Sequence, residues 1–222
     1  MIVFEKVTKQ FPNGTLALQD VSLTIEPKEF IIITGHSGAG KTTLLRLLLR
    51  EVLPTKGSIL FDKTDITRLK SRDIPKLRRQ IGAIFQDFKL LADRTVSENI
   101  AISLEIVGSP QAEIQHRVNH LLELVGLKGK GDLFPSQISG GELQRTVIAR
   151  ALAPEPKVLF ADEPTGNLDQ TTAYQIVDLL SDINKLGTTV IMATHNHDII
   201  SRLKKRTVEL AEGKITKEHD GK

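Results

Sequence analysis

Residues 35 to 42 combine glycines with a lysine and a threonine, and these residue types at this spacing can bind phosphate. Glycines let backbone N–H groups turn inward around phosphate oxygens, and a helix that starts here adds positive potential. Lys41 would reach the terminal phosphates of a nucleotide, and the Thr42 hydroxyl would bind magnesium. The alternative is an ordinary glycine-rich turn, but this segment follows an apolar strand and opens a helix, as the phosphate-binding pattern requires. We predict a nucleotide-binding loop formed by Gly35, His36, Ser37, Gly38, Ala39, Gly40, Lys41, Thr42 and Thr43.

A carboxylate pair, Asp162 and Glu163, ends the apolar run 158–161. Open α/β sheets place their ligands at the carboxyl ends of strands. We expect Asp162 to hold the magnesium shell. We expect Glu163 to be the base that polarises an attacking water, a role worth roughly a hundred- to ten-thousand-fold in rate. An acidic pair alone could equally start a solvated loop, and the phosphate-binding loop is what favours the catalytic interpretation.

The segment Ser139-Gly140-Gly141-Glu142 allows two interpretations. Ser-x-x-Glu before an apolar run is a capping box, which fixes the start of a helix. Two glycines at a helix start also leave backbone N–H groups open to an anion such as phosphate. Because the first loop already cradles one nucleotide, this second anion site indicates a second subunit.

Strands must position these residues, and four segments have the residue patterns of strands. In 21–25 apolar and polar residues alternate, as in an antiparallel strand with one face in water. Three other segments are apolar and β-branched almost throughout, as in strands buried on both faces: 30–34, 158–161 and 188–193. The sequence therefore predicts one antiparallel strand at 21–25 and three strands that are buried on both faces.

Helical patterns cover Thr42–Leu53, which ends before Pro54, and Thr171–Leu186, which ends at Gly187. Strand alternating with helix predicts a parallel α/β sheet. The region from about Phe88 to Pro135 breaks this alternation and is helical in pattern. Its apolar face is formed by Ile114, Val118, Leu121, Leu122 and Val125. Only the last residues, Lys217 to Lys222, have the composition of a frayed end.

Length and composition exclude several classes of protein. A chain of 222 residues is long enough for one domain but too short for two in tandem. The absence of cysteine excludes a disulfide framework and a thiolate metal site, and it fits a reducing compartment such as the cytosol. No stretch reaches the roughly 18 apolar residues of a membrane span, and residues 1–9 lack the apolar core of a signal peptide.

Charge gives little support to nucleic-acid binding. The net charge is +3 and the charged residues are interspersed. The densest basic segment, Arg68 to Arg79, also contains Asp73 and Pro75, and we expect it to be a solvated surface.

Taken in chain order, these features resemble the nucleotide-binding domains of ABC transporters: the phosphate-binding loop, Gln86, Ser139-Gly140-Gly141-Glu142, Asp162-Glu163, Asp169 and His195. The resemblance covers nearly the whole chain. It implies that Gln86 senses magnesium and the γ-phosphate of ATP, and that His195 contacts the γ-phosphate. It also implies that the Ser-Gly-Gly-Glu signature closes on the ATP of a partner and that Asp169 communicates across the dimer. Two ATP molecules would be sandwiched head to tail in a homodimer.

The implied fold is an α/β P-loop NTPase (RecA-like) core with a parallel sheet, an N-terminal antiparallel β subdomain and an inserted α-helical subdomain. Residues 1–222 would form a single ABC ATPase domain. The core and the antiparallel β lobe would span about 1–87 and 155–222, and the helical subdomain with the signature about 88–154.

The roles of some single residues stay open. His195, which follows the strand 188–193, could by itself be a packed loop histidine. Phe11 could stack on adenine, as an aromatic residue does near this point in the family, or it could be a core residue. The chain departs from the family pattern at Ile138, Leu143 and Asn196, where Leu, Gln and Asp are commoner, and these changes leave the chemistry intact.

Residues 161–169 resemble the branch that contains the lipoprotein-export, macrolide-export and cell-division ATPases. Within that branch, 85–91 and 94–99 look like the bacterial cell-division members. This resemblance implies a subunit on the cytoplasmic face of the plasma membrane that docks on an integral membrane partner and controls peptidoglycan hydrolases. The subunit would insert into no membrane itself and bind no nucleic acid directly. We expect Asp87, Phe88 and Leu90 to couple it to a helix of the partner.

Three other functions stay open at this point. One is the ATPase of a lipoprotein or macrolide exporter, which would differ in its membrane partner. Another is a phosphate-loop kinase for a small metabolite, which would have no use for the Ser-Gly-Gly signature. The third is a DNA-associated ATPase, which the modest net charge argues against.

Overall fold

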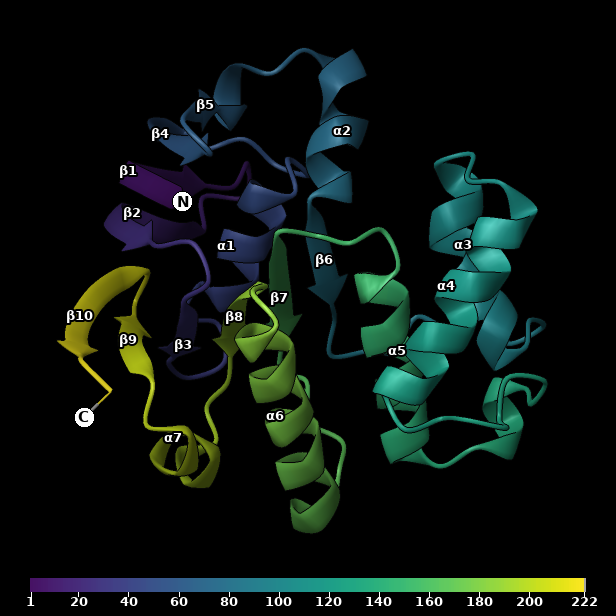
Figure 1. The fold of residues 1–222 in the computed structure, drawn as a ribbon. Helices are drawn as coiled ribbons and strands as arrows, with labels where there is room; N and C mark the ends of the chain where they lie inside the picture. The colour runs from purple at the N-terminus through teal and green to yellow at the C-terminus, as the bar shows by residue number, and fades with distance from the viewer. Residues whose placement is uncertain (222) are drawn as a thin grey trace.

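A six-stranded sheet forms the centre of the molecule (Figure 1) in a computed structural model that describes residues 1–221. Its strand order is β10-β9-β3-β8-β7-β6, with β10 antiparallel to β9 and the other neighbours parallel. The strands are β3 (Phe30–Thr34), β6 (Ile81–Ile84), β7 (Val158–Asp162), β8 (Thr189–Ala193), β9 (Arg206–Ala211) and β10 (Lys214–His219). Every residue of β7 and β8 is buried, so the continuous apolar patterns are confirmed as central parallel strands.

A smaller antiparallel sheet has the strand order β2-β1-β4-β5. Its strands are β1 (Ile2–Gln10), β2 (Leu16–Ile25), β4 (Lys56–Phe61) and β5 (Thr64–Asp65). In β2, Val21, Leu23 and Ile25 are buried while Ser22 and Thr24 are exposed. The alternating pattern is therefore confirmed as a strand with one solvent-exposed face.

Helices α3, α4 and α5 pack together on one side of the molecule, at the right of Figure 1. The α-helices are α1 (Lys41–Leu48), α2 (Ile74–Arg79), α3 (Val96–Ile106), α4 (Gln111–Leu124), α5 (Gly140–Leu152), α6 (Gln170–Lys185) and α7 (His197–Leu203). Short 3-10 turns are η1 (Ile66–Arg68), η2 (Ser71–Asp73) and η3 (Pro135–Gln137). The predicted apolar face of α4 is buried in the same cluster as α3 and α5. The proposed division of the chain near residues 87 and 155 stays a prediction.

Two hydrophobic clusters lie on opposite faces of the central sheet. In β3, Phe30 and Ile32 belong to the cluster with α3 to α6, whereas Ile31 and Ile33 belong to the cluster with α1 and the smaller sheet. This alternation follows from the two-residue period of a strand. It places α1 under one face of the sheet and α5 and α6 against the other.

Helix α1 is shorter than the sequence pattern predicts, because it ends at Leu48 rather than Leu53. Arg50 has a left-handed backbone with φ +54°, which ends the helix well before Pro54. The guanidinium of Arg78 donates to the Leu49 carbonyl at 2.9 Å, so a distant residue stabilises this early end. Helix α6 agrees with its prediction to within one residue, and Gly187 follows it with φ +107°.

The expected fraying after Lys217 is wrong for Lys217 to His219, which belong to strand β10. The strand is held by backbone pairing to β9 and by an ion pair of 2.6 Å between Arg206 and Glu218. Lys222, the last residue of the predicted frayed end, lies outside the described residues. Within residues 1–221 no helix has both the length and the apolar character needed to cross a membrane.

Candidate active site

The loop between β3 and α1 can only be built with glycine at two positions. Gly35 has φ +146°, and a Cβ there would lie 2.2 Å from the carbonyl oxygen of Leu210. Gly40 has φ +110°, and a Cβ there would lie 2.6 Å from the carbonyl oxygen of Ala17. Gly40 is also the N-cap of α1 and offers no capping side chain. The first N–H groups of α1 are therefore left to an outside acceptor, which is the arrangement that binds anions at a helix start.

A cavity of about 390 Å³ opens at this loop. It collects residues that follow the carboxyl ends of β3, β6, β7 and β8. The cavity is lined by His36, Ser37, Gly38, Gly40, Lys41, Thr42, Thr43, Gln86, Asp162, Glu163 and His195. The structure thus brings together residues that the sequence places up to 159 positions apart, from His36 to His195.

Lys41 is the buried cation of the cavity and is 7% exposed. Its Nζ donates to the carbonyl oxygens of Gly35 at 2.6 Å and His36 at 3.2 Å. The same Nζ lies 3.6 Å from Oε1 of Glu163. These contacts hold the ammonium group between the loop and the carboxylate at the end of β7.

Asp162 accepts a hydrogen bond from the Thr42 hydroxyl at 2.6 Å. Burial raises the pKa of Asp162, and the neighbouring charge of Glu163 raises it further, while the Thr42 bond and the Lys41 charge act in the opposite direction. Burial is therefore the main reason that the Asp162 carboxyl group releases its proton less readily than an exposed aspartate. Within residues 1–221 no group of three or more His, Cys, Asp or Glu side chains forms a metal cage.

Glu163 has an unusual backbone, with φ +50° in the left-handed region. The conformation is held by a hydrogen bond of 2.9 Å from the Glu163 N–H to the Ala193 carbonyl oxygen. Such backbone strain concentrates at functional sites. It directs the carboxylate toward His195, whose Nδ1 lies 2.8 Å from Oε1 of Glu163. The His195 side chain is 68% exposed, so it is not a packed loop histidine.

The capping box at Ser139 is confirmed, because Ser139 caps α5 and Glu142 accepts from the Ser139 N–H at 2.8 Å. Glu142 also pairs with Lys130. The bond from Lys130, and next the bond from the Ser139 N–H, lower the pKa of Glu142 to about 2. Ser139 and Gly140 are exposed, and the signature segment is not part of the cavity at Lys41.

Asp169 also lies outside that cavity, at the N-cap of α6. Its carboxylate accepts from the Thr172 N–H at 3.0 Å and from the Thr172 hydroxyl at 2.5 Å. These two bonds lower the pKa of Asp169, with the hydroxyl bond the larger cause. The helix cap therefore keeps the carboxylate ionised and oriented on an exposed surface.

Phe11 follows β1 and is half-buried. Lys9 Nζ and Arg46 lie 5.1 and 5.8 Å from its ring centroid. The ring belongs to neither hydrophobic cluster, so the core interpretation is wrong. It does not line the cavity at Lys41, and stacking on adenine stays a prediction.

Two side chains that the sequence did not single out hold the segment after Gln86. The Arg150 guanidinium donates to the carbonyl oxygens of Phe88 at 3.0 Å and Lys89 at 2.7 Å. Asn99 is fully buried and exchanges hydrogen bonds of 2.8 and 3.0 Å with the backbone of Leu91. The Arg150 bonds span 61 and 62 positions, so no local signal marks them. Asn99 lies only eight positions after Leu91, and an asparagine on the buried face of a helical pattern was its local signal.

Comparisons with known proteins show which family the chain resembles. The family model described as "ABC transporter" matches residues 18–166. The chain is 48% identical to "Cell division ATP-binding protein FtsE" of Bacillus subtilis, with 98% of this chain and 96% of that protein covered. It is 50% identical to the Escherichia coli protein of the same name, with 97% of each chain covered.

A solved structure shares the fold over the whole chain. It is the dimeric post-hydrolysis state of the ATP-binding cassette MJ0796 bound to ADP and Pi, at a TM-score of 0.91 and 33% identity. The match covers 100% of this chain and 99% of that one.

Proposed function

The chain belongs to the ABC transporter family of ATP-binding proteins, and from this membership we propose that it is the ATP-hydrolysing subunit of a membrane complex in bacterial cell division. The observation that carries the proposal is the cavity that joins Lys41, Thr42, Asp162, Glu163 and His195. The names of the relatives support the cell-division role. They do not favour an exporter, a metabolite kinase or a DNA-associated ATPase.

We assign the ATP phosphates to the loop 35–43, where Lys41 and the free N–H groups of α1 offer positive charge. Thr42 and Asp162 fit a magnesium ion, since a hydroxyl and a carboxylate are the hard oxygen ligands it prefers. Gln86, which faces the same cavity, would join them. A bound magnesium ion would neutralise charge on the phosphates.

Glu163 is our candidate for the base. Its carboxylate can orient a water molecule for attack on the γ-phosphorus and take the proton that this water loses. His195, at 2.8 Å, holds the carboxylate in place and faces the same cavity. Lys41, the phosphate ligand of the loop, forms an ion pair with Glu163 at 3.6 Å, so base and phosphate ligand face the same cavity.

We propose a homodimer in which each cavity is completed by the partner subunit. Ser139, Gly140 and Asp169 are exposed and lie outside the cavity of their own chain. The exposed helix start at Ser139 can still bind an anion. The related cassette is dimeric, which supports a second subunit as the source of that anion.

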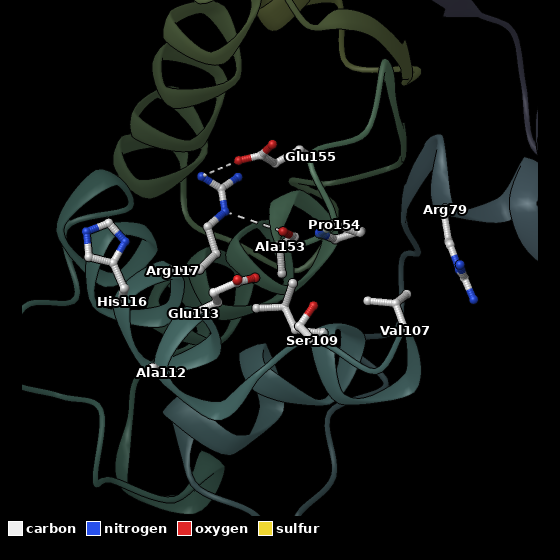
Figure 2. A pocket seen from close by; sticks show the side chains of 11 residues that line it. Arg79, Val107, Ser109, Ala112, Glu113, His116, Arg117, Ala153, Pro154 and Glu155 are labelled. Atoms are coloured by element: carbon white, nitrogen blue, oxygen red, sulfur yellow. Dashed lines mark hydrogen bonds and ion pairs between the residues drawn. The ribbon is translucent and has the colours of Figure 1, made fainter.

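We further propose that an FtsX-like integral membrane partner holds the subunit at the cytoplasmic face of the membrane. Its docking site would be the cavity of about 750 Å³ in Figure 2, between the end of α3, α4 and residues 153–155. Arg117 spans one wall of this cavity, with hydrogen bonds to the Ala153 and Leu152 carbonyls and an ion pair of 3.3 Å to Glu155. A smaller cavity of about 350 Å³ shares Arg79, Val107 and Pro154 with it. Ile106, 76% exposed, lines this second cavity and offers an apolar contact to a partner helix.

Arg150 connects the docking site to the active site. It lines the second cavity and donates to the backbone of Phe88 and Lys89, close after Gln86. Movement of a partner helix in the cavity would therefore act through these two hydrogen bonds on the segment that directly follows Gln86. Asp87 is exposed and stays a candidate contact, whereas Phe88 and Leu90 are half-buried against the helical cluster and shape the segment.

The proposal is tested by purifying the tagged Glu163→Gln protein with ATP from gently solubilised membranes and identifying the co-purified protein by mass spectrometry. We expect an FtsX-like membrane protein, and Ile106→Asp should remove it. Leu186→Asp is the matched control, since Leu186 is 73% exposed and lines neither cavity. Recovery of an exporter instead, or equal recovery with Ile106→Asp, would contradict the partner or its docking site.

A further inference from the structure

The exposed carboxylate of Asp169 and the signature glycines are joined inside one chain by a single side chain, Thr172. It lies in the first turn of α6, directly after the Asp169 cap. We propose that Thr172 is a positioning residue that fixes the Ser139-Gly140-Gly141 segment relative to Asp169, so that one subunit offers both to its partner as a rigid unit. The inference rests on the proposed homodimer.

The hydroxyl of Thr172 supplies one half of this link. Its Oγ1 donates to one carboxylate oxygen of Asp169 at 2.5 Å, while the Thr172 N–H donates to the other at 3.0 Å. A helix cap needs only the backbone bond. The second bond therefore goes beyond capping and fixes the rotation of both side chains.

The methyl group of Thr172 supplies the other half. A Cβ at Gly141 would lie 2.5 Å from Thr172 Cγ2, which is closer than carbon atoms can approach. A Cβ at the neighbouring Gly140 would lie 3.5 Å from Leu168 Cδ2, an ordinary contact. The second signature glycine is thus required by Thr172 and not by the helix.

The two halves cannot move apart, because they branch from the same Cβ. A threonine side chain has few staggered positions, and turning the methyl away from Gly141 would turn the hydroxyl away from Asp169. Any shift of the signature segment therefore also disturbs the hydrogen bond that orients the Asp169 carboxylate. If the two surfaces moved independently, the dimer would have to order both of them on closing, which weakens association.

The hydroxyl is tested in the Glu163→Gln background by the dissociation constant of the ATP-driven dimer, from light scattering over a concentration series. We expect Thr172→Val, which keeps the shape but loses the Asp169 bond, to weaken the dimer by about tenfold. Thr172→Ser, which keeps the hydroxyl, should weaken it less. Binding of a fluorescent ATP analogue to the monomer should stay the same in both, because Thr172 lies outside the cavity. Equal dimer constants for the Val and Ser variants would overturn the role of the hydroxyl.

The methyl is tested by a double-mutant cycle. Gly141→Ala alone should weaken the dimer by about tenfold or more, as overpacking does. Adding Thr172→Ser removes Cγ2 and should recover most of that loss, a gain that independent sites would not show. If Gly141→Ala is equally defective with Ser at position 172, the added methyl meets something else and the inference is wrong. If the Glu163→Gln parent itself never dimerises with ATP, the proposed function fails instead.

Discussion

The ion pair and capping box at Glu142 predict a specific dependence of stability on pH. The perturbation is Glu142→Gln, which removes the charge but keeps a side chain that can accept from the Ser139 N–H. In the folded protein the pKa of Glu142 is about 2, compared with 4.5 for an unperturbed glutamate. A carboxylate whose pKa is lowered by folding stabilises the protein above its unfolded pKa and loses this contribution as the pH falls.

The magnitude follows from this shift after allowance for solvent. Taken at face value the shift corresponds to about 3 kcal/mol. Lys130 is 42% exposed and Glu142 24%, so water screens the pair and about 1 kcal/mol is the realistic contribution. At pH 7 the wild type should therefore be about 1 kcal/mol more stable than Glu142→Gln, and this difference should shrink as the pH falls from about 4.5 toward 2.

The assay is urea unfolding followed by circular dichroism at several pH values between 7 and 3. Glu98→Gln is the matched control, because Glu98 closes a second capping box, with Thr95, but its cation Arg94 lies farther away at 3.4 Å. The difference in unfolding free energy between wild type and Glu98→Gln should be smaller than the difference for Glu142→Gln. A difference between wild type and Glu142→Gln that stays constant from pH 7 to pH 3 would refute the assignment to Glu142, since below about pH 4.5 the unfolded state takes up a proton that the folded Glu142 does not.

Two further changes test packing around the active site by thermal or urea unfolding. Gly35→Ala should lower the free energy of unfolding by about 3 kcal/mol or more, because its Cβ would lie 2.2 Å from the Leu210 carbonyl oxygen. Gly38→Ala is the control: Gly38 has φ +81° and no atom within 4 Å of an added Cβ, so this change should lower it by about 1 kcal/mol. Equal costs would show that backbone conformation, not the close approach, makes Gly35 necessary. Asn99→Ala should lower the free energy of unfolding by about 3 kcal/mol, because it removes the hydrogen bonds between the fully buried Asn99 amide and the backbone of Leu91, Arg94 and Thr95. Asn119→Ala, exposed on α4, should lower it by well under 1 kcal/mol. A loss below 1 kcal/mol at Asn99 would mean that the segment after Gln86 is held by other contacts.

Much of the site could be predicted because its chemistry is local in the chain. The glycine loop before Lys41 and the pair Asp162-Glu163 each carry their function within a few residues. The buried strands that precede them, 30–34 and 158–162, are recognisable from continuous apolar runs. Where parallel strands end side by side, such residues must meet.

What could not be predicted depends on contacts between distant parts of the chain. Helix α1 ends early at a position held by Arg78, and no local signal marks that contact. The bonds from Arg150 to residues 88 and 89 span more than 60 positions. The need for glycine at 141 is explained by Thr172 on another helix, although the sequence indicated only an open helix start.

The central claim is that two copies of this chain enclose ATP, each with its own loop at Lys41 and the partner's signature at Ser139. The most direct test is light scattering of Glu163→Gln with and without magnesium and ATP. The account predicts that ATP doubles the mass from the 24.5 kDa chain and that Ser139→Arg in the same background binds ATP yet stays at 24.5 kDa. A Glu163→Gln protein that keeps the monomer mass with ATP, or that hydrolyses ATP at the wild-type rate, would contradict it.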